Sequence, residues 1–282
     1  MHGSGDFERV EGEAEFVGVY PFTLAATSLT YPHRDLIHNL MQLPPIFDGV
    51  EIMLEYPLTL PLKKEQRQAV ERLVRERALS VTVHLPLSLQ LASTNPWFRD
   101  ASLRTLDEAF QALEFLEPKA YVLHVAPFMP FERTPLGQTF EVQMHRSRME
   151  AAWESLGKVA EVMDPQRIAV ENLQYDFGYL EEIVRTHGFS VCMDVGHLRQ
   201  TGSDIFAFYD RWQSRIRVIH LHDLHNGMDH QLVDQASAAL PLDAFCLLLH
   251  ETRYRHTLVL EQFHPQYLRR SLDVLLPLLG TC

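Results

Sequence analysis

A carboxylate and an imidazole follow a short apolar run in the second half of the chain. The segment 189–197 reads F-S-V-C-M-D-V-G-H, so Asp194 ends the run and His197 follows three residues later. The run is typical of a buried strand, and the two groups at its end suit a transition-metal ion. The alternative is an ordinary strand whose terminal Asp194 caps the next helix, because a short D-x-x-H pattern often occurs by chance.

Five further apolar runs end in a histidine or a carboxylate. Each such residue alone has an ordinary explanation, such as a hydrogen-bonded core histidine or a glutamate in an ion pair. Together they favour a metal site, because buried carboxylates need a compensating cation and no Lys or Arg ends these runs. The whole set is His84, His124, Glu171, Asp194, His220 with His222 and Asp223, and Glu261.

Eight apolar runs alternate with helical patterns along the chain. This order indicates βαβ units with a parallel sheet, and eight units in 282 residues most simply close into a single-domain α/β (β/α)8 TIM barrel. An open doubly wound sheet is the alternative, but no G-x-G-x-x-G or P-loop motif follows the first run. The predicted strands are 22–28, 49–54, 80–86, 120–125, 167–171, 189–194, 217–223 and 257–263.

In a TIM barrel the functional groups lie at the C-terminal ends of the strands, so the residues at the strand ends would share one rim. Mixed His and carboxylate ligands suit Zn, Mn, Fe or Co better than Ca, and we predict one or two such divalent ions. Cys192 lies two residues before Asp194 and is expected to face the barrel interior as a small apolar residue.

The composition narrows the class of partner. With 25 basic and 37 acidic residues, the net charge of −12 argues against binding of bulk nucleic acid. No apolar run approaches about eighteen residues, so we expect no membrane contact. A small molecule is therefore the expected partner.

Two features bear on location and domain organisation. The three cysteines, Cys192, Cys246 and Cys282, are far apart and form no C-x-x-C pair, and the N-terminal stretch lacks the apolar segment of a secretory signal. Both features predict a reducing cytoplasm. We expect residues 1–20 to be a mobile acidic arm and residues 21–282 to form the barrel.

From about Phe22 to Leu279 the chain resembles the xylose-isomerase-like TIM barrels, which include sugar isomerases and epimerases and the endonuclease IV type of nuclease. The resemblance rests on the residues at the strand ends. It implies that one metal ion is held as in the sugar epimerases, by Glu171, Asp194, His220 and Glu261.

The nuclease branch of the superfamily has further histidines, which His84 and His124 match. His197 matches a histidine that binds a third metal in that branch. The branch separates the Asp and His of its third site by one residue, whereas Asp229 and His230 are adjacent here. A third metal site therefore stays open, and His230 is expected instead to contact substrate.

A cobamide-remodelling branch of the superfamily resembles the chain more closely. The similarity lies in A-T-S-L-T-Y-P at 26–32, G-V-E-I-M-L-E-Y at 49–56 and T-V-H-L-P-L at 82–87. It implies a corrinoid substrate and hydrolysis of a phosphoester in its nucleotide loop. In that reaction, His84 and His124 would hold one ion and Asp194, His220 and Glu261 a second about 4 Å away, with Glu171 bridging the two ions.

A metal-dependent sugar or sugar-phosphate isomerase or epimerase is the alternative. Glu171 and Glu261 would then be the catalytic acid and base, and His197 would orient a hydroxyl. His222 would support a ligand or bind substrate.

A carrier of corrinoid or metal without catalysis is a third alternative. Trp97, Phe98, Phe128 and Phe131 would form either an apolar wall for a planar ligand or ordinary helix–barrel packing.

Overall fold

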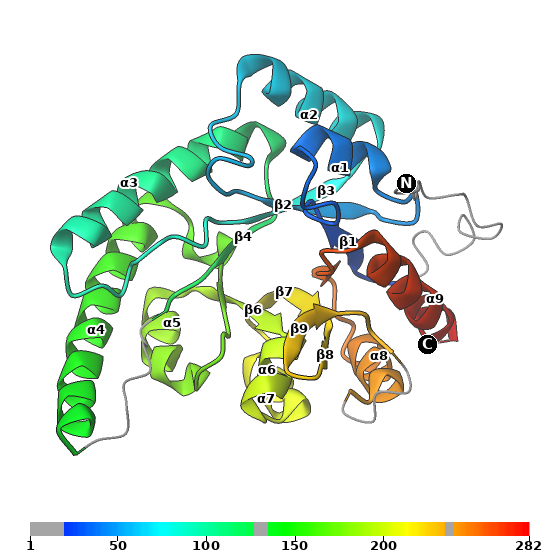
Figure 1. Cartoon of the computed structure of the whole chain (residues 1–282). Coiled ribbons are helices and arrows are strands. Elements are labelled where there is room, and N and C mark those ends of the chain that lie inside the picture. The colour runs from blue at the N-terminus through cyan, green and yellow to red at the C-terminus, as the bar shows by residue number, and fades with distance from the viewer. Residues whose placement is uncertain (1–19, 127–134, 235–239, 282) are drawn as a thin grey trace.

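The structure, a computed structural model, describes residues 20–126, 135–234 and 240–281. In these ranges eight parallel strands form a closed barrel in the order β1-β10-β7-β6-β5-β4-β3-β2, which confirms the predicted (β/α)8 fold (Figure 1). The barrel strands are β1 Thr23–Thr27, β2 Gly49–Met53, β3 Ser80–His84, β4 Ala120–Leu123, β5 Ile168–Glu171, β6 Ser190–Asp194, β7 Ile216–Leu221 and β10 Thr257–Leu260.

Helices surround the barrel and connect successive strands (Figure 1). None of the helices in the described ranges is both long and apolar enough to cross a membrane. The predicted N-terminal arm lies outside the described residues, except for Tyr20, whose ring stacks on Phe22. The α-helices are α1 Leu36–Gln42, α2 Lys64–Glu76, α3 Pro96–Leu113, α4 Pro135–Val162, α5 Glu181–His187, α6 Val195–Thr201, α7 Ile205–Trp212, α8 Leu242–Glu251 and α9 Pro265–Thr281.

Several helix boundaries follow from capping residues. The side chain of Asn95 accepts a hydrogen bond from the Trp97 amide and Pro96 occupies the first turn, so α3 begins three residues before the predicted start at Arg99. Likewise α4 begins at Pro135, although the sequence predicts a loop through residue 138. Gly188 adopts φ 82° and ends α5, as predicted. The short 3₁₀ helices are η2 Glu114–Leu116, η3 Pro165–Arg167 and η4 Phe177–Leu180.

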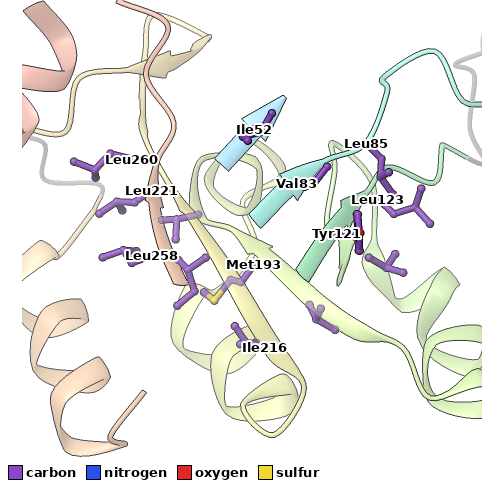
Figure 2. Packing of buried hydrophobic residues seen from close by; sticks show 14 of the residues in the cluster. Ile52, Val83, Leu85, Tyr121, Leu123, Met193, Ile216, Leu221, Leu258 and Leu260 are labelled. Atoms are coloured by element: carbon purple, nitrogen blue, oxygen red, sulfur yellow. The ribbon is translucent and has the colours of Figure 1, made fainter. Parts of the chain in front are cut away.

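Side chains alternate between two buried layers along each strand. Residues such as Ile52, Val83, Met193 and Leu258 pack between the strands and the helices (Figure 2). The intervening residues form the barrel interior, and they are small: Ala25, Ala120, Val122, Ala169, Cys192, Val218 and Val259. Cys192 lies here as predicted. By the same alternation, the inward-facing residue that follows this small layer lies at the C-terminal rim in several strands.

Two elements near this rim differ from the predicted pattern. His197 lies in helix α6, where the sequence predicts only a turn. The predicted polar loop after β7 is a hairpin of β8 (Asp223–His225) and β9 (Met228–Gln231), so β7 ends at Leu221 rather than residue 223. Asn226 and Gly227, with φ 53° and 76°, form the tight turn that an Asn-Gly pair favours.

Candidate metal centre

Three carboxylates from neighbouring strands converge on one imidazole nitrogen. His220 Nδ1 lies 3.5 Å from Glu171 Oε1, 3.7 Å from Asp194 Oδ2 and 3.2 Å from Glu261 Oε2. All four side chains are buried at the C-terminal ends of β5, β6, β7 and β10. The structure therefore brings together the four residues that the resemblance implies for one metal ion.

The other carboxylate oxygen of Glu171 faces a second group of ligands. Glu171 Oε2 lies 2.9 Å from His124 Nε2 and 3.5 Å from His84 Nε2. His84 Nδ1 lies 2.9 Å from the carbonyl of Leu85, which can only accept a hydrogen bond. This contact leaves the lone pair of His84 Nε2 directed at the site, as a metal ligand requires. Glu171 thus lies between the two groups, in the arrangement that the bridging hypothesis needs.

Asp194 is positioned both to cap a helix and to face the candidate metal site, the two alternative roles that the sequence leaves open. Its Oδ1 accepts a hydrogen bond from the His197 amide and caps α6, while Oδ2 faces His220. The cap places the His197 ring beside the same group, with Nδ1 3.5 Å from Glu171 Oε1. Asn172 holds the end of β6, since its amide donates to the Asp194 carbonyl and accepts from the Asp194 amide.

A third cluster contains His197, His222 and His230. Asp229 Oδ2 lies 3.9 Å from Nε2 of both His197 and His230. Adjacent strand residues normally face opposite sides, but His230 has φ 52°, which interrupts the alternation and brings its ring beside Asp229. Adjacency is therefore no obstacle to a third metal site, and the question of a third metal stays open.

His222 and His230 differ in their access to solvent. His222 is fully buried behind Asp194, with Nε2 3.0 Å from Oδ2, so its described contact supports a ligand. His230 is 22% exposed, and its Nδ1 lies 3.5 Å from Glu261 Oε2. His230 is thus better placed than His222 to meet a substrate, and both predicted substrate contacts stay predictions.

Glu51 belongs to this centre and was missed in the sequence. Its Oε1 lies 2.9 Å from His220 Nε2, and its Oε2 accepts a hydrogen bond from Thr82. The side chain is 1% exposed. The available signal was a carboxylate between Val50 and Ile52 in an otherwise apolar strand, where period two places it in the barrel.

Burial opposes ionisation of these carboxylates, and the neighbouring imidazoles outweigh it. Burial raises the pKa of Glu171, but His124 and His220 hold it well below its ordinary value. In the same way His222 and His197 lower the pKa of Asp194, and His220 lowers that of Glu261. The carboxylates are therefore anionic at neutral pH and suited to a cation.

The polar contacts of the centre test whether a metal ion fits. Glu51 Oε1, Glu261 Oε2 and both ring nitrogens of His220 are buried without a well-directed hydrogen bond. Such orphaned ligand atoms are rare in protein interiors, and no Lys or Arg lies among these residues. A mixed His and carboxylate set of this kind fits a divalent transition-metal ion. The metal roles themselves stay predictions.

The predicted aromatic wall is only partly described. Trp97 and Phe98 are 78% and 51% exposed at the start of α3, so they do not pack between helix and barrel. Phe128 and Phe131 lie outside the described residues.

Comparison with known proteins places the chain among related barrels. The model of the xylose isomerase-like TIM barrel family matches residues 47–278. No curated protein matches the sequence significantly.

The chain is also similar to solved structures of low sequence identity. A D-tagatose 3-epimerase-like protein has 20% identity and a TM-score of 0.74, covering 92% of this chain and 98% of that one. A 3-keto-D-glucoside 4-epimerase from E. coli has 15% identity and a TM-score of 0.70, covering 93% and 100%. A D-psicose 3-epimerase from Clostridium cellulolyticum H10 has 15% identity and a TM-score of 0.68, covering 92% and 99%. At these identities the likeness shows the fold.

Proposed function

The chain belongs to the xylose isomerase-like TIM barrel family, and on this premise we propose that it is a divalent-metal-dependent epimerase or isomerase of a sugar or sugar phosphate. One observation carries the proposal. Glu171 and Glu261 lie on either side of the strands that bear Asp194 and His220, and each places an oxygen within 3.5 Å of His220 Nδ1. Two carboxylates around one ligand group suit acid–base chemistry at a single carbon. The epimerase names of the structural neighbours point the same way.

The chemistry requires a proton to leave and return at a carbon next to a carbonyl group. Glu171, Asp194, His220 and Glu261 would hold the cation, which polarises the carbonyl oxygen and acidifies the neighbouring C–H bond. One of the two anionic glutamates accepts the proton. The other must first take up a proton in the substrate complex, and it then donates that proton to the opposite face. His197, fixed by the Asp194 cap and by a 3.1 Å contact of Nδ1 with the Asn172 carbonyl, orients a hydroxyl.

Solvent exchange at the reacting carbon tests the proposal. The metal-loaded protein is incubated with ketoses and sugar phosphates in D₂O, and deuterium uptake and epimer formation are measured. Glu171→Gln and Glu261→Gln should each lower turnover by about 10²–10⁴-fold with the fold retained, because each removes a general acid or base. Glu150→Gln, on the exposed surface of α4, is the matched control and should be fully active. Full activity of either site variant would reject the proposal.

Hydrolysis of a phosphoester is the second candidate, and one observation favours it. His84 and His124 lie against Glu171 Oε2, which gives a second ligand group that a one-ion epimerase does not need. Two cations would supply Lewis-acid stabilisation of the charge on a phosphoester. The comparisons offer no support for the corrinoid substrate that the sequence suggests, so corrinoid phosphodiesters enter only as members of the substrate panel.

Metal stoichiometry separates the two candidates. Elemental mass spectrometry of protein purified without chelator should give about one Zn, Mn, Fe or Co per chain for the epimerase and two or more for the hydrolase. If the protein is the one-ion epimerase, His84→Ala should leave the metal content unchanged. If it is the hydrolase, His84→Ala should lose one ion per chain. A chain that holds no metal, and binds none on addition of Mn or Zn, would reject both.

A further inference from the structure

A pocket lies on the face of the barrel opposite the candidate metal centre. Its volume is about 410 Å³, within the range of small-molecule sites. Arg217 stands at the start of β7 and His256 directly precedes β10, whereas His220 and Glu261 lie at the other ends of these strands. Because the strands are parallel, the pocket and the metal centre are on opposite rims.

The pocket is strongly basic in an acidic protein. Arg217, Arg253 and Arg255 line it, and no Asp or Glu does. Arg253 and Arg255 are both exposed, and neither forms an ion pair with a carboxylate within the described ranges. The net charge of the chain is −12, so three guanidinium groups without a balancing carboxylate are unusual for this surface. Their charge would be balanced by an anionic ligand.

One of the three arginines is held in place. Arg217 Nη1 lies 2.8 Å from His256 Nε2, and a guanidinium can only donate, so the imidazole must accept in its neutral form. Burial and the charge of Arg217 lower the pKa of His256 to about 4, in agreement with this contact. The remaining N–H groups of Arg217 are therefore presented from a fixed position. Ser214 adds a hydroxyl group to the wall.

We infer that this pocket binds a dianionic phosphate group, either free phosphate or the phosphate of a small phosphorylated metabolite. Guanidinium forks match the oxygens of phosphate. Three of them, one from the start of β7 and two from the segment between α8 and β10, suit a dianion better than a single carboxylate. Nucleic acid is a poor candidate, because the cluster is confined to one pocket on an acidic chain. The inference does not depend on the reaction proposed for the metal centre.

Calorimetric titration of the full chain, treated with chelator and kept in a buffer without phosphate, tests the inference. The probes are inorganic phosphate and glycerol 2-phosphate, with chloride at matched ionic strength as the reference. We expect saturable binding that weakens at least tenfold in Arg217→Gln and in Arg255→Gln. Arg104→Gln, which removes an exposed charge from α3, is the matched control and should bind like the wild type.

The outcomes are distinct. Tighter binding of glycerol 2-phosphate identifies a phosphate ester as the ligand, and equal binding identifies free phosphate. If Arg217→Gln does not fold, Arg253→Gln replaces it, because that side chain is exposed. Binding no stronger than that of chloride, or an equal loss in Arg104→Gln, would overturn the inference. Since no metal is present, these results are independent of the proposed activity.

Discussion

At the scale of single residues, Asp194 and Glu171 each use their two carboxylate oxygens for different partners. Asp194 caps α6 with Oδ1 and faces His220 with Oδ2. Glu171 faces His220 with Oε1 and His124 with Oε2. A carboxylate fixed on both sides would lose little further freedom on binding a cation, so these two residues are the preorganised part of the candidate centre.

Glu51 provides the first prediction at this scale. Its Oε1 lies 2.9 Å from His220 Nε2, and a negative charge at this position favours the ring orientation in which Nδ1 faces Glu171, Asp194 and Glu261. Supporting carboxylates of this kind typically contribute about 10–100-fold to metal affinity. We expect Glu51→Gln to weaken Mn or Zn binding by that factor, measured by titration against a chelating dye. Glu55→Gln is the control. Glu55 lies four residues after Glu51, partly exposed in the loop that follows β2, and its substitution should leave metal binding unchanged.

If the affinity of Glu51→Gln equals that of the wild type, the contact with His220 has no positioning role.

His256 provides a prediction of pH dependence. Its pKa is lowered from 6.5 to about 4 in the folded protein, by burial and by Arg217, so between these values the unfolded chain binds a proton that the folded chain does not. The stability that His256 contributes is present above pH 6.5 and is lost as the pH falls toward 4. Melting temperatures in buffers without phosphate should fall less steeply over this range in His256→Gln than in the wild type. Parallel profiles would contradict the assignment.

At the scale of elements, α6 and the β8–β9 hairpin complete the centre from outside the barrel. Helix α6 supplies His197 and the hairpin supplies Asp229 and His230. A buried ion pair between Arg199 and Asp223 joins the two elements. The hairpin and the helix therefore position these candidate ligands as one unit, although Asp229 and His230 lie nine and ten residues after His220 in the sequence.

Close approach of α6 to His222, the residue that follows β7, depends on a glycine. A Cβ atom at Gly196 would lie 2.0 Å from His222 Cε1, and the buried ring has no room to move. We expect Gly196→Ala to displace His222 from Asp194 and to lower the free energy of unfolding by about 1–3 kcal/mol, as overpacking does. Denaturant unfolding measures the change.

Gly157→Ala is the matched control for this substitution. Its Cβ would meet His187 at 3.4 Å, an ordinary contact, inside helix α4. Alanine should therefore be neutral there or stabilise the helix by about 0.5–1 kcal/mol. Equal destabilisation by the two substitutions would mean that the approach of α6 to His222 is not the cause.

At the scale of the whole molecule, a bound cation would connect strands from around the barrel. The candidate ligands come from β3, β5, β6 and β7 and from the residues that follow β4 and β10. The ligand set is assembled only in the closed barrel, so binding favours the folded state. At a metal concentration about 100 times Kd the gain is about 2.7 kcal/mol.

We therefore expect Mn or Zn to raise the melting temperature of chelator-treated protein by several degrees, since about 1 kcal/mol shifts Tm by roughly 2–4 °C in a domain of this size. Differential scanning calorimetry measures the shift. The variant Glu171→Gln, which alters the carboxylate between two ligand groups, should show a smaller shift. A melting temperature that does not respond to metal would contradict a site built from the closed barrel.

The sequence by itself determined the barrel and most of the polar residues at its C-terminal rim. Strand side chains alternate with period two, so an apolar run that ends in Glu171, Asp194 or His220 already indicates which residues face inward. Eight runs separated by helical patterns then indicate a closed parallel sheet, whose strand ends meet at one rim. These are local regularities that neighbouring residues along the chain specify.

Only the tertiary structure decided which of these residues meet. Glu51 reaches His220 because β2 and β7, three strands apart around the closed barrel, both direct side chains into its interior, a relation that no local pattern contains. The positive φ of His230 lets it and Asp229 approach His197 together. Arg217 lines the same pocket as Arg253 and Arg255 because β7 and β10 begin side by side at one end of the barrel. Contacts of this kind depend on the register of distant strands and on loop conformation, which the closure of the whole barrel sets.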